Sequence, residues 1–171
     1  MSDEDIKIHR GLNNVYFDRT KTTYINGKEG VLEYRGYNIH DLSEKSSFEE
    51  VSYLLLYGKL PTKNELDLFN KSLKESREIP SKVIDIIRSI KESHPMDVLR
   101  TAVSALSAFD EEASDKSYDA TMRKGIRLTS QVPTIVMAHN AIRAGKDPVE
   151  PSKELSHAAN FIYMLDGKIP S

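Results

Sequence analysis

The chain has 171 residues, enough for one domain with a core of its own. It is 39% hydrophobic and 29% charged with a net charge of −2, which disfavours disorder and phosphate-driven binding of nucleic acid. Its longest apolar run, Tyr53 to Tyr57, is far shorter than the roughly 20 residues of a membrane-spanning helix. With no cysteine and an acidic start, unlike a secretory signal, the sequence predicts a soluble, cytoplasmic protein that binds neither nucleic acid nor membrane.

The first part of the chain is predicted to be a flexible arm followed by a β-hairpin. Residues 1–12 are rich in charge and form the arm, and the folded domain is expected over 13–171. The hairpin is predicted between Val15 and Gly36, because strand formers at 22–25 and 31–34 flank the turn sequence NGKEG. Asn-Gly tolerates the positive φ values that tight turns require.

Helical patterns follow from residue 38 onward. A single turn is expected at 41–44. Thr62 and Glu65 have the spacing of a capping box, and Pro133 is expected to kink the longest helix. The predicted helices cover 47–57, a segment that begins after Thr62, a segment that begins at Pro80, and 95–109, 118–144 and 152–165. The last of these is expected to bury one face, which carries Leu155, Ala159, Ile162 and Leu165.

The predicted helix over 95–109 is apolar on two sides. One stripe contains Met96, Leu99, Val103 and Leu106, and a second contains Val98, Ala102, Ala105 and Phe109. A helix with two apolar stripes and small residues among them is typical of a helix packed between two partners. The pattern therefore predicts that this helix is covered on both sides.

Reactive constellations are hard to find in the sequence. It contains no phosphate-binding glycine loop, no nucleophile elbow and no zinc motif. No two of the five histidines share a helix face, so each is expected to be a hydrogen-bonded structural residue; they are His9, His40, His94, His139 and His157. The adjacent carboxylates at 49–50 and 111–112 point to different sides of a helix and are predicted to be solvated.

Longer stretches of the sequence resemble the citrate synthase family. The resemblance is strongest at YLLLYGKLPT over 53–62, and continues in HPMDVLRTAV over 94–103 and FIYMLDGKIP over 161–170. GLNNV at 11–15, GVLEYRGY at 30–37, IHDL at 39–42 and SFEEV at 47–51 also match. These segments occur in order along the whole chain, in the short form typical of bacterial and archaeal enzymes.

The resemblance implies a mainly α fold, the citrate-synthase-like helical large-domain portion with a small N-terminal hairpin. Full-length members condense acetyl-CoA with oxaloacetate and water to give citrate and CoA, without a metal ion. Family members polarise the thioester with a His, remove a proton with an Asp and grip oxaloacetate with Arg residues. Those residues are expected after Ser171, and none of the five histidines matches a catalytic position. The resemblance therefore places no catalytic, cofactor-binding or metal-binding residue in this chain, which is expected to be inactive alone.

The resemblance also implies association with a second copy of the chain. In the family, the helices that correspond to about 95–110 and 118–144 pack across a two-fold axis, which would bring Ala102, Ser104 and Ala105 close to their counterparts. Two alternatives stay open. The chain belongs to a 2-methylcitrate synthase that uses propionyl-CoA, or it is a non-catalytic dimerisation or regulatory module derived from the fold.

Overall fold

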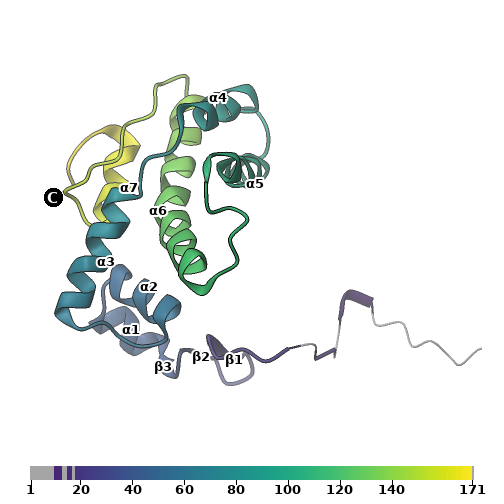
Figure 1. The fold of residues 1–171 in the computed structure, drawn as a ribbon, viewed down its shortest axis with the longest axis vertical. Coiled ribbons are helices and arrows are strands. Elements are labelled where there is room, and N and C mark those ends of the chain that lie inside the picture. The colour runs from purple at the N-terminus through teal and green to yellow at the C-terminus, as the bar shows by residue number, and fades with distance from the viewer. Residues whose placement is uncertain (1–9, 13–14, 17, 171) are drawn as a thin grey trace, which may run out of the picture.

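Residues 10–12, 15–16 and 18–170 are described in the computed structural model (Figure 1). The fold is mainly helical with a small antiparallel sheet, as predicted. The strands are β1 (Thr23–Asn26), β2 (Val31–Tyr34) and β3 (Tyr37–Asn38). The helices are α1 (Ile39–Lys45), α2 (Phe48–Tyr57), α3 (Lys63–Glu75), α4 (Ser81–Ser89), α5 (Pro95–Leu106), α6 (Tyr118–Arg143) and α7 (His157–Asp166). Of the predicted arm, residues 10–12 form a 3₁₀ turn, and residues 1–9 lie outside the described residues.

The predicted hairpin is confirmed, and a third strand extends it. β1 pairs with β2 from Thr23 opposite Tyr34 to Asn26 opposite Val31, and β2 then pairs with β3. The second turn was not predicted. It is formed by Arg35 and Gly36, both with positive φ (52° and 85°), as a tight two-residue hairpin turn requires. Arg35 is held in this unfavourable conformation by its guanidinium, whose Nη2 donates to the Leu55 carbonyl at 2.8 Å.

Side-chain caps determine where α2 and α3 begin. The predicted capping box of α3 is present, since Thr62 N–H donates to Glu65 Oε2 at 2.8 Å and Glu65 N–H donates back to Thr62 Oγ1. Ser47 and Glu50 form a second capping box at the start of α2. Each box satisfies backbone N–H groups that have no partner within the helix. The predicted turn at 41–44 is longer than expected, because the Asn38 side chain accepts from His40 N–H and begins α1.

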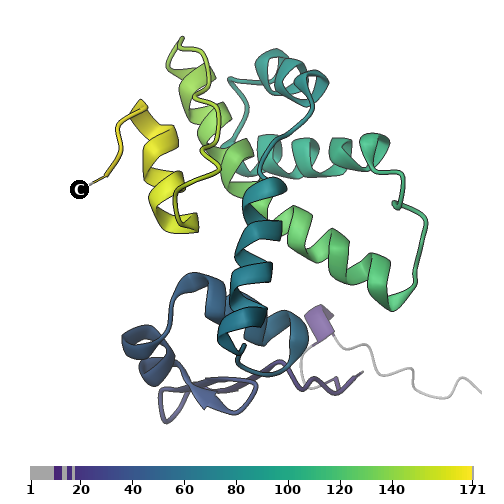
Figure 2. The ribbon, with the colours of Figure 1, turned by 60° about the vertical axis from the view of Figure 1, so that its left-hand side comes forward.

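The main core lies between α4, α5 and α6 (Figure 2). Its buried side chains repeat at helical spacing on each of the three helices. They are Val83 and Ile87 on α4, Val98, Ala102 and Leu106 on α5, and Ile135, Ala138 and Ile142 on α6. Within a single chain α5 is not covered on both sides, since Met96 is 62% exposed and Phe109, just beyond its end, is 42% exposed; cover of the second side by another copy stays a prediction. Of the described helices, α4 and α6 make the main contacts with α5, and both pack against the side that carries Ala102.

A smaller core joins α2, α3 and α6. The rings of Tyr53 and Phe69 meet edge to face with centroids 5.4 Å apart, and Leu73 is buried beside them. Gly125 brings α6 close to α2, because a Cβ atom there would lie 3.1 Å from a methyl group of Leu56. A larger side chain at residue 125 would separate the two helices.

Pro133 lies inside α6, as the sequence predicts. Because it has no backbone N–H, it cannot donate to the Thr129 carbonyl, and the helix loses one internal hydrogen bond. Figure 2 shows the axis of α6 changing direction along its length. Along its length α6 packs against α3, α4, α5 and α7.

The last helix differs from the prediction in its start and in its buried face. α7 begins at His157 and is capped by Ser156, whereas a start at Ser152 was expected. The Ser152 hydroxyl accepts from the N–H groups of Glu154 and Leu155, and this local turn competes with helix formation. The covered side chains are His157, Asn160 and Met164, while the expected Ile162 and Leu165 are 50% and 52% exposed.

None of the helices in the described ranges combines the length and the apolar character needed to cross a membrane.

Leucines 68 and 73 on α3 provide a matched test of the smaller core. Leu73 is 1% exposed and Leu68 is 69% exposed. We expect Leu73→Ala to lower the free energy of unfolding by about 2–5 kcal/mol, because it leaves a cavity. Leu68→Ala should change it by no more than about 0.5 kcal/mol. Urea unfolding followed by circular dichroism measures both values, and equal losses would contradict the packing described for α3.

Candidate functional site

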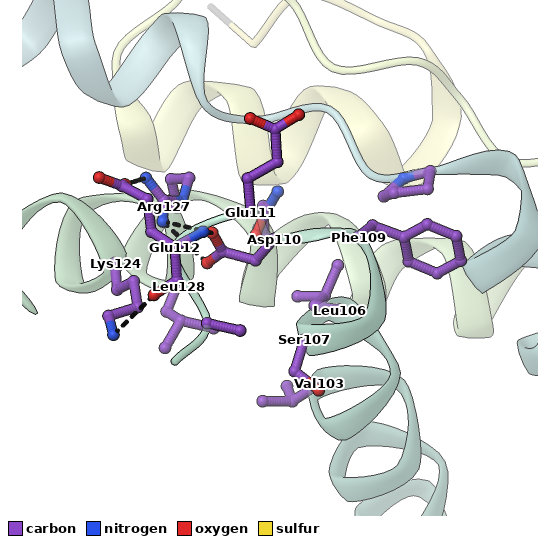
Figure 3. Close-up of a pocket in the computed structure, with 13 residues that line it drawn as sticks. Val103, Leu106, Ser107, Phe109, Asp110, Glu111, Glu112, Lys124, Arg127 and Leu128 are labelled. Atoms are coloured by element: carbon purple, nitrogen blue, oxygen red, sulfur yellow. Dashed lines mark hydrogen bonds and ion pairs between the residues drawn. The ribbon is translucent and has the colours of Figure 1, made fainter. Parts of the chain in front are cut away.

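A pocket of about 490 Å³ lies between the end of α5, the segment 110–117 and the first half of α6 (Figure 3). Apolar side chains such as Val103, Leu106 and Leu128 form one part of its wall. Charged side chains form the other part, from Asp110, Glu111 and Glu112 on the segment and from Lys124 and Arg127 on α6. Because it gathers acidic and basic side chains around a cavity, this pocket is a candidate active or binding site.

Four of the charged side chains that line this pocket are bound by charged groups or by backbone carbonyls beside it. Arg127 donates to both oxygens of Asp110 at 2.9 and 2.8 Å and to Glu112 at 2.9 Å. Arg123 donates to Glu112 as well, and Lys124 donates to two carbonyls of the segment, those of Glu112 and Asp115. We call Asp110, Glu112, Arg123 and Arg127 the loop ion cluster.

These pairs hold the carboxylates in their charged form. Hydrogen bonds from Arg123 and then Arg127 lower the pKa of Glu112 from 4.5 to about 2, and Arg127 also lowers the pKa of Asp110. A general base at neutral pH needs a pKa near 7, so neither group is tuned for that role. The prediction that residues 111–112 are solvated is wrong for Glu112, because the Arg residues that bind it lie 11 and 15 positions further along the chain.

A second polar cluster lies where α2, α7 and the α3–α4 connection meet. Arg77 is only 2% exposed, and its guanidinium donates to the carbonyl of Ser152. Glu49 accepts from the backbone N–H of His157 at 2.8 Å, which places a carboxylate at the start of α7. The Ser152 N–H in turn donates to the Asn160 side chain at 2.7 Å. We call Glu49, Arg77, Ser152, His157 and Asn160 the buried junction.

The buried junction was not found from the sequence. Glu49 was predicted to be solvated, but the structure places it at the start of α7, 108 positions away along the chain. Arg77 carries no sequence signal, because a single basic residue between two helices is usually exposed. Its guanidinium is bound by a carbonyl 75 positions away along the chain, that of Ser152.

The histidines are dispersed, as predicted. His40 is exposed on α1, and His94 caps α5 by accepting from Met96 N–H at 3.2 Å. His139 is buried with Nε2 3.0 Å from the Lys91 carbonyl. His157 is buried and stacks on Phe48, with ring centroids 4.4 Å apart.

The hydrogen-bonded structural role expected of the histidines is confirmed for His94 and His139, while His9 lies outside the described residues. His157 differs, because its buried Nδ1 has no partner in the described part of the chain. In the ranges that the structure covers, no three His, Asp or Glu side chains are grouped closely enough to hold a metal ion.

Comparison with known proteins assigns the chain to a family. The family model described as "Citrate synthase, C-terminal domain" matches residues 11–171. The chain belongs to the citrate synthase family. The citrate synthases of Haloferax volcanii and Deinococcus radiodurans are 42% and 45% identical to it over 170 and 165 residues. Each match covers 96% of this chain, but only 45% and 44% of those proteins.

Solved citrate synthases share the fold. The structure of the Pyrobaculum aerophilum enzyme matches with a TM-score of 0.90 at 38% identity, covering 96% of this chain and 43% of that one. A ternary complex of the Thermoplasma acidophilum enzyme with carboxymethyl coenzyme A and oxaloacetate matches with a TM-score of 0.86 at 27% identity, covering 96% and 44%. This chain therefore spans less than half of the length of the citrate synthases it matches.

The buried imidazole of His157 should make stability depend on pH. Burial, and then the nearby charge of Arg77, lowers the pKa of His157 below 6.5, although the charge of Glu49 opposes this shift. The unfolded chain then binds a proton more readily than the folded chain, so stability is complete above about pH 6.5 and is lost as the pH falls below that value.

We expect the free energy of unfolding to fall more steeply between about pH 7.5 and pH 5.5 for the unmodified chain than for His157→Gln, which cannot titrate. Urea unfolding at each pH measures the difference. His40→Gln, at an exposed position, is the matched control and should keep the steep dependence. A His157→Gln variant with an unchanged slope would contradict the assignment.

Proposed function

We propose that this chain is the N-terminal portion of a citrate synthase. In the whole enzyme, a carboxylate would remove a proton from the methyl group of acetyl-CoA. The resulting enol would attack the ketone of oxaloacetate to form a carbon–carbon bond, and water would then cleave the thioester to give citrate and CoA. The observation that carries the proposal is the match to the Pyrobaculum aerophilum enzyme, with a TM-score of 0.90 over 96% of this chain and 43% of that one.

The charged groups of this chain support a scaffolding role within that enzyme. The carboxylates of the loop ion cluster are bound by Arg residues, and Glu49 is bound at the start of α7. A catalytic base must be free to accept a proton from the substrate. We therefore assign the proton transfer and the binding of oxaloacetate to the part of the enzyme that this chain does not contain. Acetyl-CoA and oxaloacetate are proposed as substrates of the whole enzyme, which needs no metal ion and works in the cytoplasm.

The activity is tested with the chain alone and with a chimera. We expect the 171-residue chain to release no CoA from acetyl-CoA and oxaloacetate in a thiol assay, because the positioning of the reacting groups is missing. Joined after Pro170 to the unmatched remainder of the Pyrobaculum aerophilum enzyme, the chain should release CoA. Acetyl-CoA and propionyl-CoA are compared in the same assay, and the intact Pyrobaculum aerophilum enzyme is the positive control.

Saturable CoA release by the chain alone would contradict the placement of the catalytic residues. An inactive chimera beside an active control enzyme would count against the proposed function itself.

A homodimer formed through α5 and α6 is the second part of the proposal. It is supported by apolar side chains that face water on both helices, with Met96 62% and Val136 37% exposed. Of the three small residues expected at the interface, Ala102 is fully covered by the core of its own chain, and Ala105 packs partly against the same core. Ser104 is exposed, so its side chain is open to contact with a second copy.

Ser104→Glu should weaken self-association by at least about tenfold, because two like charges would meet across the two-fold axis. Ser81→Glu, the same change at an exposed position on α4, should have no effect. Sedimentation equilibrium at micromolar concentrations measures both variants. An unmodified chain that sediments as a monomer would rule the interface out.

A further inference from the structure

The turn between β1 and β2 contains a chemically reactive pair, Asn26 and Gly27. Of the asparagines in the chain, only Asn26 is followed by glycine. Asn26 ends β1 and Gly27 begins the turn, where Asn26 is partly exposed and Gly27 is exposed to water. The backbone nitrogen that follows an asparagine is held close to the carbon of its side-chain amide, so the attack of one on the other is intramolecular and closes a small ring.

Gly27 leaves the attacking nitrogen unobstructed. A Cβ atom at this position would have no heavy atom within 4 Å beyond its chain neighbours, and Gly27 is not among the residues with positive φ. Neither packing nor backbone conformation therefore requires glycine here. A methyl group at residue 27 would fit the folded turn, but it would lie beside the nitrogen that must approach the Asn26 amide.

The hydrogen bonds of the Asn26 side chain activate its amide. Oδ1 accepts from the N–H of Lys28 at 3.2 Å and from the N–H of Glu29 at 3.4 Å. Nδ2 donates to Oε2 of Glu29 at 2.9 Å. Two backbone N–H groups directed at a carbonyl oxygen stabilise the negative charge that forms on it when a nucleophile attacks. The turn thus provides a nucleophile, a polarised carbonyl and access to water.

We propose that Asn26 is a site of spontaneous deamidation. The Gly27 nitrogen loses its proton to water and forms a bond to Cγ of Asn26. The Cγ–Nδ2 bond breaks, and Nδ2 takes a proton from water and leaves as ammonia, which gives a cyclic imide. Water, the only co-reactant, then opens the ring at either of its carbonyls. Residue 26 becomes aspartate or, when the main chain runs through the former side chain, isoaspartate.

The product opens the hairpin from its tip. The Glu29 carboxylate, which accepts a hydrogen bond from Asn26, would then face a second carboxylate at the same short distance, and like charges repel. Asn26 pairs with Val31 at the end of the β1–β2 ladder nearest the turn. Isoaspartate also lengthens the main chain at this pair and disturbs the register. Deamidation therefore acts as a slow, irreversible switch of the small sheet.

The modification is tested on the 171-residue chain in neutral water labelled with heavy oxygen, by mass spectrometry of its peptides. We expect Asn26 to lose its amide at least about tenfold faster than Asn64, which is exposed and precedes Glu65. Each product should carry one heavy oxygen atom, and both aspartate and isoaspartate should form because the ring opens on either side. Equal rates at the two positions, or aspartate alone, would overturn the proposal.

Gly27→Ala separates the chemistry from the fold. We expect this variant to keep the circular dichroism and urea unfolding of the unmodified chain, because the turn has room for the methyl group. Its Asn26 should deamidate at least about tenfold more slowly, since the nitrogen is obstructed. An unchanged rate would show that the Gly27 nitrogen is not the nucleophile.

The effect on the hairpin is tested with Asn26→Asp, which introduces the second carboxylate directly. Backbone amides of β1 and β2 should exchange with solvent at least about twofold faster than in the unmodified chain. Adding Glu29→Gln should reverse this gain, because the new amide donates where the carboxylate repelled. Asn64→Asp, the same change on α3, should leave the exchange of the strands unaltered. Unchanged exchange in Asn26→Asp, or a gain that Glu29→Gln does not reverse, would overturn the switch.

Discussion

The burial of α6 among its neighbours is the constraint on which the rest of the structure depends. This 26-residue helix contacts α3, α4, α5 and α7, and Ile135 at its centre is fully covered. Its polar side chains also hold the connections between the other helices. Thr134 Oγ1 donates to the Arg77 carbonyl at 2.8 Å and Gln131 to the Glu78 carbonyl at 3.0 Å, while His139 lies 3.0 Å from the Lys91 carbonyl. The segments just before and just after α4 are thus both fixed by hydrogen bonds to α6.

Charged groups join elements that are distant in sequence. In the buried junction, Glu49 on α2 binds the start of α7, and Arg77 binds the turn that precedes it. In the loop ion cluster, Arg127 fixes the segment that connects α5 to α6. Partly buried pairs of this kind are strong because the geometry is bidentate or includes backbone groups. Their partners bind them structurally, in keeping with the scaffolding role proposed for this part of the enzyme.

Apolar surface remains open on the sides of α5 and α7 that face away from the cores. Met96 on α5 and Leu165 on α7 are both more than half exposed. A helix buries two stripes only when partners lie on both sides, and α5 has α4 and α6 on one side alone. This chain matches less than half of each relative. In the function we propose, the rest of the enzyme and a second subunit would bury the apolar faces of α5 and α7 that are exposed here.

The sequence by itself determined the features that depend on neighbouring residues. It predicted the first hairpin, the capping box at Thr62, the long helix with Pro133 inside it, and the family, because caps, turns and a run of matching motifs are local signals. Tertiary structure decided the rest. The third strand needed an Arg at positive φ whose side chain is held by the Leu55 carbonyl, 20 positions away. The partners of Glu49 and Glu112 and the covered face of α7 likewise depend on contacts between segments distant in the chain, which no local pattern encodes.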